Sequence, residues 1–109
     1  MKKKSHKLDA LIPAVLDYLG KDAVRFMPHA LERLAEREIT RPEVFFVLKT
    51  GKHERAKDRW DETFGMWHYA IRGKTLDGKD LRIVVSVEEP HLLIITTIDL
   101  SVQRRRWKA

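Results

Sequence analysis

The sequence predicts an α+β domain in which two or three helices precede a four-stranded antiparallel sheet. Three observations lead to this prediction: apolar residues recur at helical spacing before Gly51, strand-like alternation follows it, and 109 residues suit a single core. We divide the chain into an N-terminal extension with an amphipathic helix (residues 1–24), the α+β domain (25–99) and a basic C-terminal tail (100–109).

The first half of the chain contains three helical patterns. Residues 8–20 have an apolar stripe, with Asp9 as a possible cap and Gly20 as the stop. After a short link, residues 28–38 form the second helix, which begins at Pro28. Thr40 and Glu43 have the spacing of a capping box, which starts a third helix that ends at Gly51. We expect the last two helices to pack as a hairpin.

The second half reads as four strands, at residues 52–57, 66–72, 81–87 and 92–98. An Asp-Gly turn at 77–78 and Pro90 separate the last three strands, which indicates an antiparallel meander. In residues 81–87 the odd positions are uniformly apolar and the even positions are mixed. Helices therefore cover one face of the sheet, and the other face is open to a ligand.

Alternation also assigns faces in the strand at residues 66–72. Trp67, Tyr69 and Ile71 share one face, and His68 and Arg72 share the other. Aromatic side chains can stack on bases, but an alternating set in a strand is more often core. We expect the first set to pack on the helices and His68 and Arg72 to lie on the open face.

Net charge is +6, with the excess at the two ends, in Lys2-Lys3-Lys4 and in Arg104, Arg105, Arg106 and Lys108. Basic ends of this kind favour binding to a polyanion such as RNA or to an acidic partner such as an antitoxin protein. The alternative is that the tails are solvated and contribute only to solubility. Charge does not separate these interpretations.

Composition limits the cofactors and the compartment. There is no cysteine, and the five histidines lack metal-ligand spacing, so we expect no metal and no other cofactor. No apolar run approaches the roughly 18 residues that span a bilayer, and the N-terminal segment lacks the features of a signal peptide. We expect a cytoplasmic protein that does not enter membranes; its oligomeric state stays open.

The second helix carries His29, Arg33 and Arg37 at i, i+4 and i+8. At about 100° per residue these side chains form one stripe, while Leu31 and Leu34 point elsewhere and can hold the helix on the core. A proton-transfer group beside two cations suits phosphodiester chemistry. The alternative is a packing or capping histidine beside surface arginines, with Glu36 and Glu38 as ion-pair partners.

The pattern F-x-x-H-A-x-x-R-x-x-E-R-x-I-T, at residues 26–40, and the strands that follow it resemble a bacterial domain-of-unknown-function family. That family is grouped with RelE-like toxins and, more distantly, with barnase, EndoU and colicin-type ribonucleases. The resemblance implies a RelE-like fold and metal-independent RNA cleavage by attack of the ribose 2′-OH. Carried over by position, His29, Arg33, Arg37 and Thr96 are its site residues.

Such cleavage needs a base, an acid and cations for the charge on phosphorus-bound oxygens. His29 would be base or acid, Arg33 and Arg37 would bind the phosphate, and Thr96 would hold a phosphate oxygen or orient His29. The second proton carrier is His68, His53 or Tyr69, of which we favour His68. We assign substrate binding to five arginines: Arg72, Arg82, Arg104, Arg105 and Arg106.

Two functions follow from this reasoning. The first is a toxin-like endoribonuclease of a toxin-antitoxin system. The second is a catalytically inactive RelE-like module that binds nucleic acid or a protein partner. RelE-type ribosome-dependent toxins are dense in Lys and Arg across the sheet, whereas the last three strands here carry only Arg72 and Arg82. This difference argues against ribosome-dependent cleavage of messenger RNA.

Overall fold

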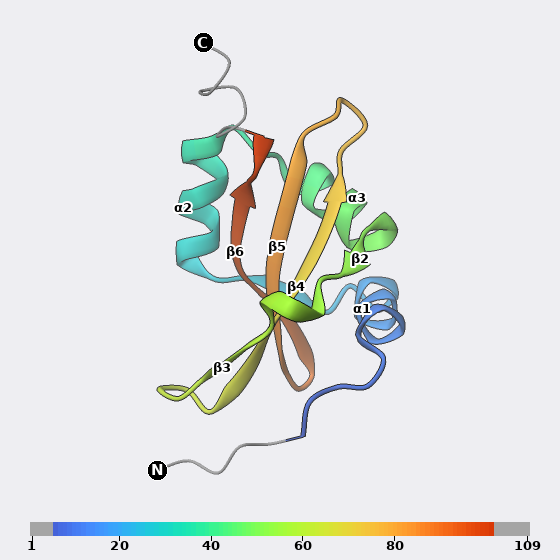
Figure 1. Cartoon of the computed structure of the whole chain (residues 1–109), viewed down its shortest axis with the longest axis vertical. Helices are drawn as coiled ribbons and strands as arrows, with labels where there is room; N and C mark the ends of the chain where they lie inside the picture. Colours follow the sequence, from blue (N-terminus) through green and yellow to red (C-terminus); the bar gives the residue numbers. More distant parts are fainter. Residues whose placement is uncertain (1–5, 102–109) are drawn as a thin grey trace.

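A computed structural model describes residues 6–101 of the chain. Within this range the helices are α1 (Leu11–Gly20), α2 (Pro28–Arg37) and α3 (Arg41–Thr50), with one 3₁₀ turn, η1 (Arg55–Lys57). The strands are β1 (Val24–Phe26), β2 (Lys52–His53), β3 (Arg59–Asp61), β4 (Met66–Lys74), β5 (Asp80–Glu88) and β6 (His91–Asp99). Figure 1 shows these elements in one view.

The α+β class and the β4–β5–β6 meander are confirmed, but the predicted number of strands is wrong. The sheet has six strands in the order β1-β6-β5-β4-β2, and β3 pairs with β4. It is not wholly antiparallel, because β1 runs parallel to β6. The sequence showed neither β1 nor β3 as a strand, since each is only three residues long and depends on a partner distant in the chain or across a hairpin.

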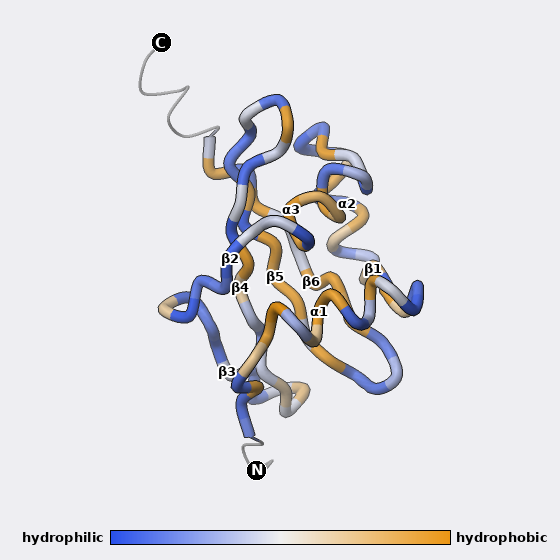
Figure 2. The backbone as a smooth tube through the Cα atoms, turned by 90° about the vertical axis from the view of Figure 1, so that its right-hand side faces the viewer, coloured by the Kyte–Doolittle hydropathy of each residue, from blue (hydrophilic) through white to orange (hydrophobic). Residues whose placement is uncertain are grey.

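The three helices lie on one side of the sheet, and η1 and the β3–β4 hairpin project away from them (Figures 1 and 2). Leu11 of α1, Val44 of α3 and Ile83 of β5 are fully buried where these layers meet. As the alternation predicted, Leu81, Ile83 and Val85 all face the helices. We call the sheet surface opposite α1 and α3 the open face.

Two predictions about the helices need correction. Asp9 does not cap α1, which begins at Leu11 after Ala10 and has no side-chain cap. The helices α2 and α3 do not form a packed hairpin, because α2 packs mainly on β6 and α3 packs on α1 and β4 (Figure 1). The sequence could not show this, because the apolar stripe of a helix does not indicate which helix or strand it packs on.

The predicted start of α3 is confirmed. The Thr40 side chain accepts a hydrogen bond from the Glu43 backbone, and the Glu43 side chain accepts one from the Thr40 backbone, so the capping box is complete. At the other end, a Cβ atom on Gly51 would lie 2.6 Å from the Val47 carbonyl oxygen and 2.7 Å from the Arg72 carbonyl oxygen. Only glycine fits where the chain leaves α3 and passes β4.

Candidate functional site

The α2 stripe brings two of its three predicted members into contact. Arg33 Nε donates a hydrogen bond to His29 Nε2 across 3.3 Å. Arg33 Nη1 also lies 2.7 Å from Glu36 Oε2, so the predicted ion pair with a neighbouring glutamate forms. His29 is exposed, and Arg33 and Arg37 are half-buried.

The core contact of α2 differs from the prediction. Ala30 and Leu34 are buried in the main core, whereas Leu31 is 38 % exposed. The side of the helix that faces the sheet is thus centred on Ala30 and Leu34, and Arg33 and Arg37 lie at its margin. This position keeps two cations close to the sheet while their charged ends reach solvent.

Thr96 lies on the open face because of an irregularity in β6. The pairing passes from Val84–Thr96 to Val85–Ile94, so Ile95 is an extra residue in β6. Simple alternation would place Ile94 and Thr96 on the same face. The bulge instead buries Ile94 and places Thr96 beside Val84 on the open face, in the strand that α2 packs against (Figure 1).

Arg72 and Arg82 also lie on the open face, but both are held by carboxylates. Arg82 Nε donates to Glu54 Oε1 at 2.6 Å, and Arg72 Nη2 donates to Asp80 Oδ2 at 2.8 Å. The hydrogen bond from Arg82 is the largest cause of a lowered pKa at Glu54, and the hydrogen bond to Asp80 raises the pKa of Arg72. Two cations and two anions therefore balance in this network.

The structure separates the three candidates for the second proton carrier. His68 lies on the open face, opposite Arg59 in the ladder of β3 and β4, with Nε2 3.4 Å from Asp61 Oδ2. Burial lowers its pKa, Arg59 lowers it further, and Asp61 opposes the shift. A lowered pKa leaves the imidazole neutral at neutral pH, in the form that accepts a proton.

His53 and Tyr69 are both turned into the fold. The His53 side chain is 8 % exposed, and its Nε2 lies 2.8 Å from Asp58 Oδ2. Tyr69 is buried in the core, its hydroxyl accepts a hydrogen bond from the Leu8 backbone, and burial raises its pKa. Of the three candidates, His68 alone lies on the open face.

Sequence reasoning missed several residues that shape this face. Glu54 and Asp80 neutralise Arg72 and Arg82, and the Asp58 side chain is buried directly after the strand predicted at residues 52–57. No local signal marks them, because each partner is distant in sequence or in another element. Arg104, Arg105 and Arg106 lie outside the described residues. Among residues 6–101, no three His, Asp or Glu side chains form a group that would hold a metal ion.

The fold and this face define a small α+β domain with its helices on one side of a six-stranded sheet. The family described as Domain of unknown function (DUF4258) matches residues 26–99, and the chain belongs to that family. The match begins at the last residue of β1 and ends with β6, so α1 precedes it. No curated protein and no solved structure matches the chain. No helix among the described residues is long and apolar enough to cross a membrane.

Proposed function

We propose that this protein is a RelE-like, metal-independent endoribonuclease of a toxin-antitoxin system. The observation that carries the proposal is the solvent-exposed hydrogen bond between Arg33 and His29 on α2. In this contact an imidazole lies next to a guanidinium, on a helix that packs against β6, the strand of Thr96. A base or acid beside a phosphate-binding guanidinium is the arrangement that phosphodiester cleavage requires.

The two histidines take different roles in the proposed reaction. His68, whose pKa burial lowers, is neutral and would accept the proton of the ribose 2′-OH. When a phosphate binds, Arg33 would leave His29 for a phosphate oxygen. His29 would then protonate the leaving 5′ oxygen. Arg37 and Thr96 would bind the other phosphate oxygens, and no metal enters the reaction.

The test is RNA cleavage in EDTA by the wild type and by His29→Ala, with product ends analysed for 2′,3′-cyclic phosphate. Removal of a general acid or base lowers the rate by about 100-fold or more, so His29→Ala should be nearly inactive. Because His29 is exposed, the thermal melt of His29→Ala should match that of the wild type. His6→Ala, at another exposed histidine, is the matched control and should cleave normally. Equal cleavage by His29→Ala would refute the assignment.

The balanced charges on the open face favour a second function. Arg72 already forms an ion pair with Asp80, and Arg82 forms one with Glu54. Such pairing is expected of a surface ion-pair network rather than of a phosphate-binding site. In this alternative the protein is an inactive RelE-like module that binds nucleic acid or a protein partner. It predicts salt-sensitive binding that weakens when Arg104, Arg105 and Arg106 are neutralised, with no cleavage by the wild type.

A further inference from the structure

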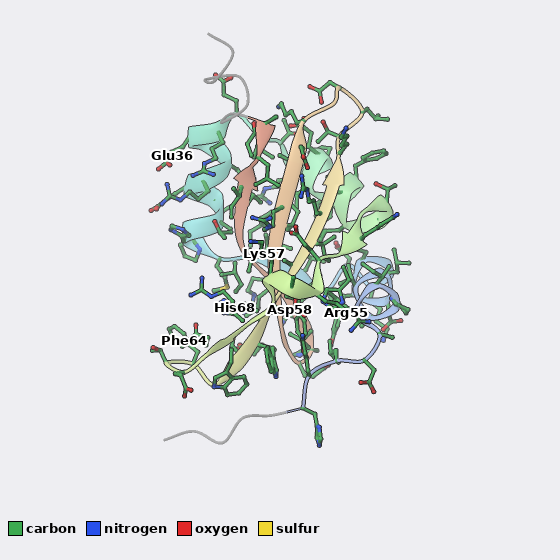
Figure 3. The ribbon with its side chains drawn as sticks, viewed as in Figure 1. Glu36, Arg55, Lys57, Asp58, Phe64 and His68 are labelled. Carbon is green, nitrogen blue, oxygen red and sulfur yellow. The ribbon has the colours of Figure 1, made fainter. Side chains whose placement is uncertain are left out.

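The segment at residues 55–65, which contains η1, β3 and the turn after β3, exposes cations and an aromatic ring together. We call it the cationic arm. Arg55, Lys57 and Arg59 are exposed, and Phe64 is 65 % exposed. The arm lies on the side of the sheet away from the helices (Figures 1 and 2). In the view of Figure 3, Lys57 lies at η1, Phe64 at the outer end of the β3–β4 hairpin, and His68 between them.

The buried Asp58 explains why the charges of the arm are unbalanced. Its side chain is 1 % exposed and lies 2.7 Å from Lys7 Nζ, and its Oδ1 accepts the backbone N–H of Ala70 at 3.1 Å. His53 is its third partner. The negative charge of Asp58 is therefore used inside the fold, while the residues on both sides of it point to solvent.

The neighbouring cations lack carboxylate partners. Among the described residues, no carboxylate oxygen lies within ion-pair distance of Lys57 or Arg59. Within the same described range, Arg55 donates only to the backbone oxygen of Asp9. This differs from the network of Arg72 and Arg82, which is neutralised. Lys57 and Arg59 are thus the open-face cations best placed to bind an anionic ligand.

Phe64 is presented on an ordered turn. Asp61 Oδ1 accepts the backbone N–H groups of Thr63 and Phe64, at 2.9 and 3.2 Å. Behind the turn, Trp60 and Trp67 pair across the hairpin with ring centroids 5.7 Å apart. A ring this exposed contributes little to the core, and the braced turn holds it ready to stack on a flat partner.

We propose that the cationic arm binds single-stranded RNA, with phosphates on Lys57 and Arg59 and an unpaired base stacked on Phe64. The inference rests on the proposed function and extends it to the strandedness and path of the substrate. Aromatic stacking between backbone-binding cations is how proteins bind single strands, whereas a duplex hides the faces of its bases. Arg59 is opposite His68 in the ladder of β3 and β4. An RNA strand bound to Arg59 would therefore lead to His68, the proposed general base.

The probe is a fluorescent single-stranded oligodeoxyribonucleotide of about ten nucleotides, a length within the usual site size of such surfaces. It lacks the 2′-OH, so binding is measured separately from cleavage. Phe64→Ala should weaken binding about fivefold or more, and Phe64→Tyr should retain it. Lys57→Gln with Arg59→Gln should lower the slope of log affinity against log salt by about 1.4.

Matched controls lie elsewhere on the surface. Leu76→Ala removes the side chain of an 89 % exposed residue, and Lys21→Gln with Lys49→Gln removes two cations at α1 and α3; both should bind like the wild type. Glu62 is the one exposed acid within residues 55–65, so Glu62→Gln should strengthen binding. Thermal melts should match the wild type, because all the substituted residues are exposed and, within residues 6–101, only Lys21 among them forms a side-chain ion pair.

Three results would overturn the inference: the arm variants bind like their matched controls, a DNA duplex binds as tightly as the single strand, or a polyglutamate peptide of equal charge competes fully. The last result would indicate an acidic protein partner instead. If the arm variants behave as expected and the wild type cleaves no RNA, the arm is a single-strand binding surface and the proposed catalysis is wrong. The two proposals can therefore fail separately.

Discussion

His29 and His68 show how surroundings give one residue type two behaviours. His29 is exposed on a helix and accepts a hydrogen bond from Arg33. His68 is half-buried in β4, where burial is the first cause of its lowered pKa. Because the pKa of His68 is lower in the folded state than in the unfolded state, the folded protein binds fewer protons just below pH 6.5. Acidification should therefore reduce its stability.

We predict that His68→Gln weakens this acid sensitivity. As pH falls through about 6.5, the unfolded chain takes up a proton at His68 before the folded protein does, so the free energy of unfolding decreases. The measurement is urea unfolding of both proteins at about pH 7.5 and about pH 5.5, since the other titrating groups are common to both. An equal loss of stability in wild type and variant would contradict the lowered pKa.

At the residue scale, the sheet face on which a side chain lies was easier to predict than its interaction partner. Alternation correctly assigned Tyr69 and Ile71 to the core and Arg72 to the open face. It could not pair Arg82 with Glu54, which is 28 residues away, or bury Asp58 within a charged stretch. Both contacts depend on how β2 and η1 meet the sheet, and residue spacing does not encode that.

At the element scale, α3 is the helix whose limits the sequence predicted best. Thr40, Pro42 and Glu43 act within one turn, and Gly51 is required where the chain passes β4. The same local chemistry is missing before α1, where Ala10 offers no side-chain acceptor. A cap at Asp9 would have started that helix at Ala10, one residue before its observed start at Leu11.

We predict that Thr40→Ala lowers the free energy of unfolding by about 1 kcal/mol, because the Glu43 backbone N–H loses its acceptor. Thr40→Ser keeps a hydroxyl at the cap and is the control, so its free energy of unfolding should stay close to that of the wild type. Urea denaturation monitored by circular dichroism measures both changes. Equal stabilities of the two variants would show that the capping box contributes nothing.

The elements that sequence reasoning missed are short and depend on tertiary contacts. β1 was interpreted as a link, yet it pairs with Leu92, Leu93 and Ile94 of β6. β3 exists only as the partner of β4, and it belongs to the cationic arm. Three residues are too few to show a period, so only the partner strand makes such a segment a strand.

At the scale of the whole molecule, α1 is part of the domain it precedes. Leu11, Val15 and Tyr18 are buried in the same core as α3 and the sheet, although the family match begins at residue 26. The sequence left open whether this helix packs on its own domain or on a second copy. In the structure it packs on its own domain.

We predict that Leu11→Ala lowers the free energy of unfolding by about 2–5 kcal/mol, since it opens a cavity in the core. Leu16→Ala, on the 45 % exposed side of the same helix, should change it by less than about 0.5 kcal/mol. Urea denaturation at several protein concentrations measures both. A large effect of Leu16→Ala, or a stability that rises with concentration, would indicate that α1 packs on a second copy.

By itself the sequence determined the α+β class, the three helices, the β4–β5–β6 meander and the stripe that joins His29 to Arg33. These features depend on side-chain period, capping and turn chemistry, which act over a few neighbouring residues. Tertiary structure decided the parallel pairing of β1, the bulge that places Thr96 on the open face, the neutralisation of Arg72 and Arg82, and the exposure of the cationic arm. Each of these depends on which distant segments meet, and only packing of the whole chain selects those partners.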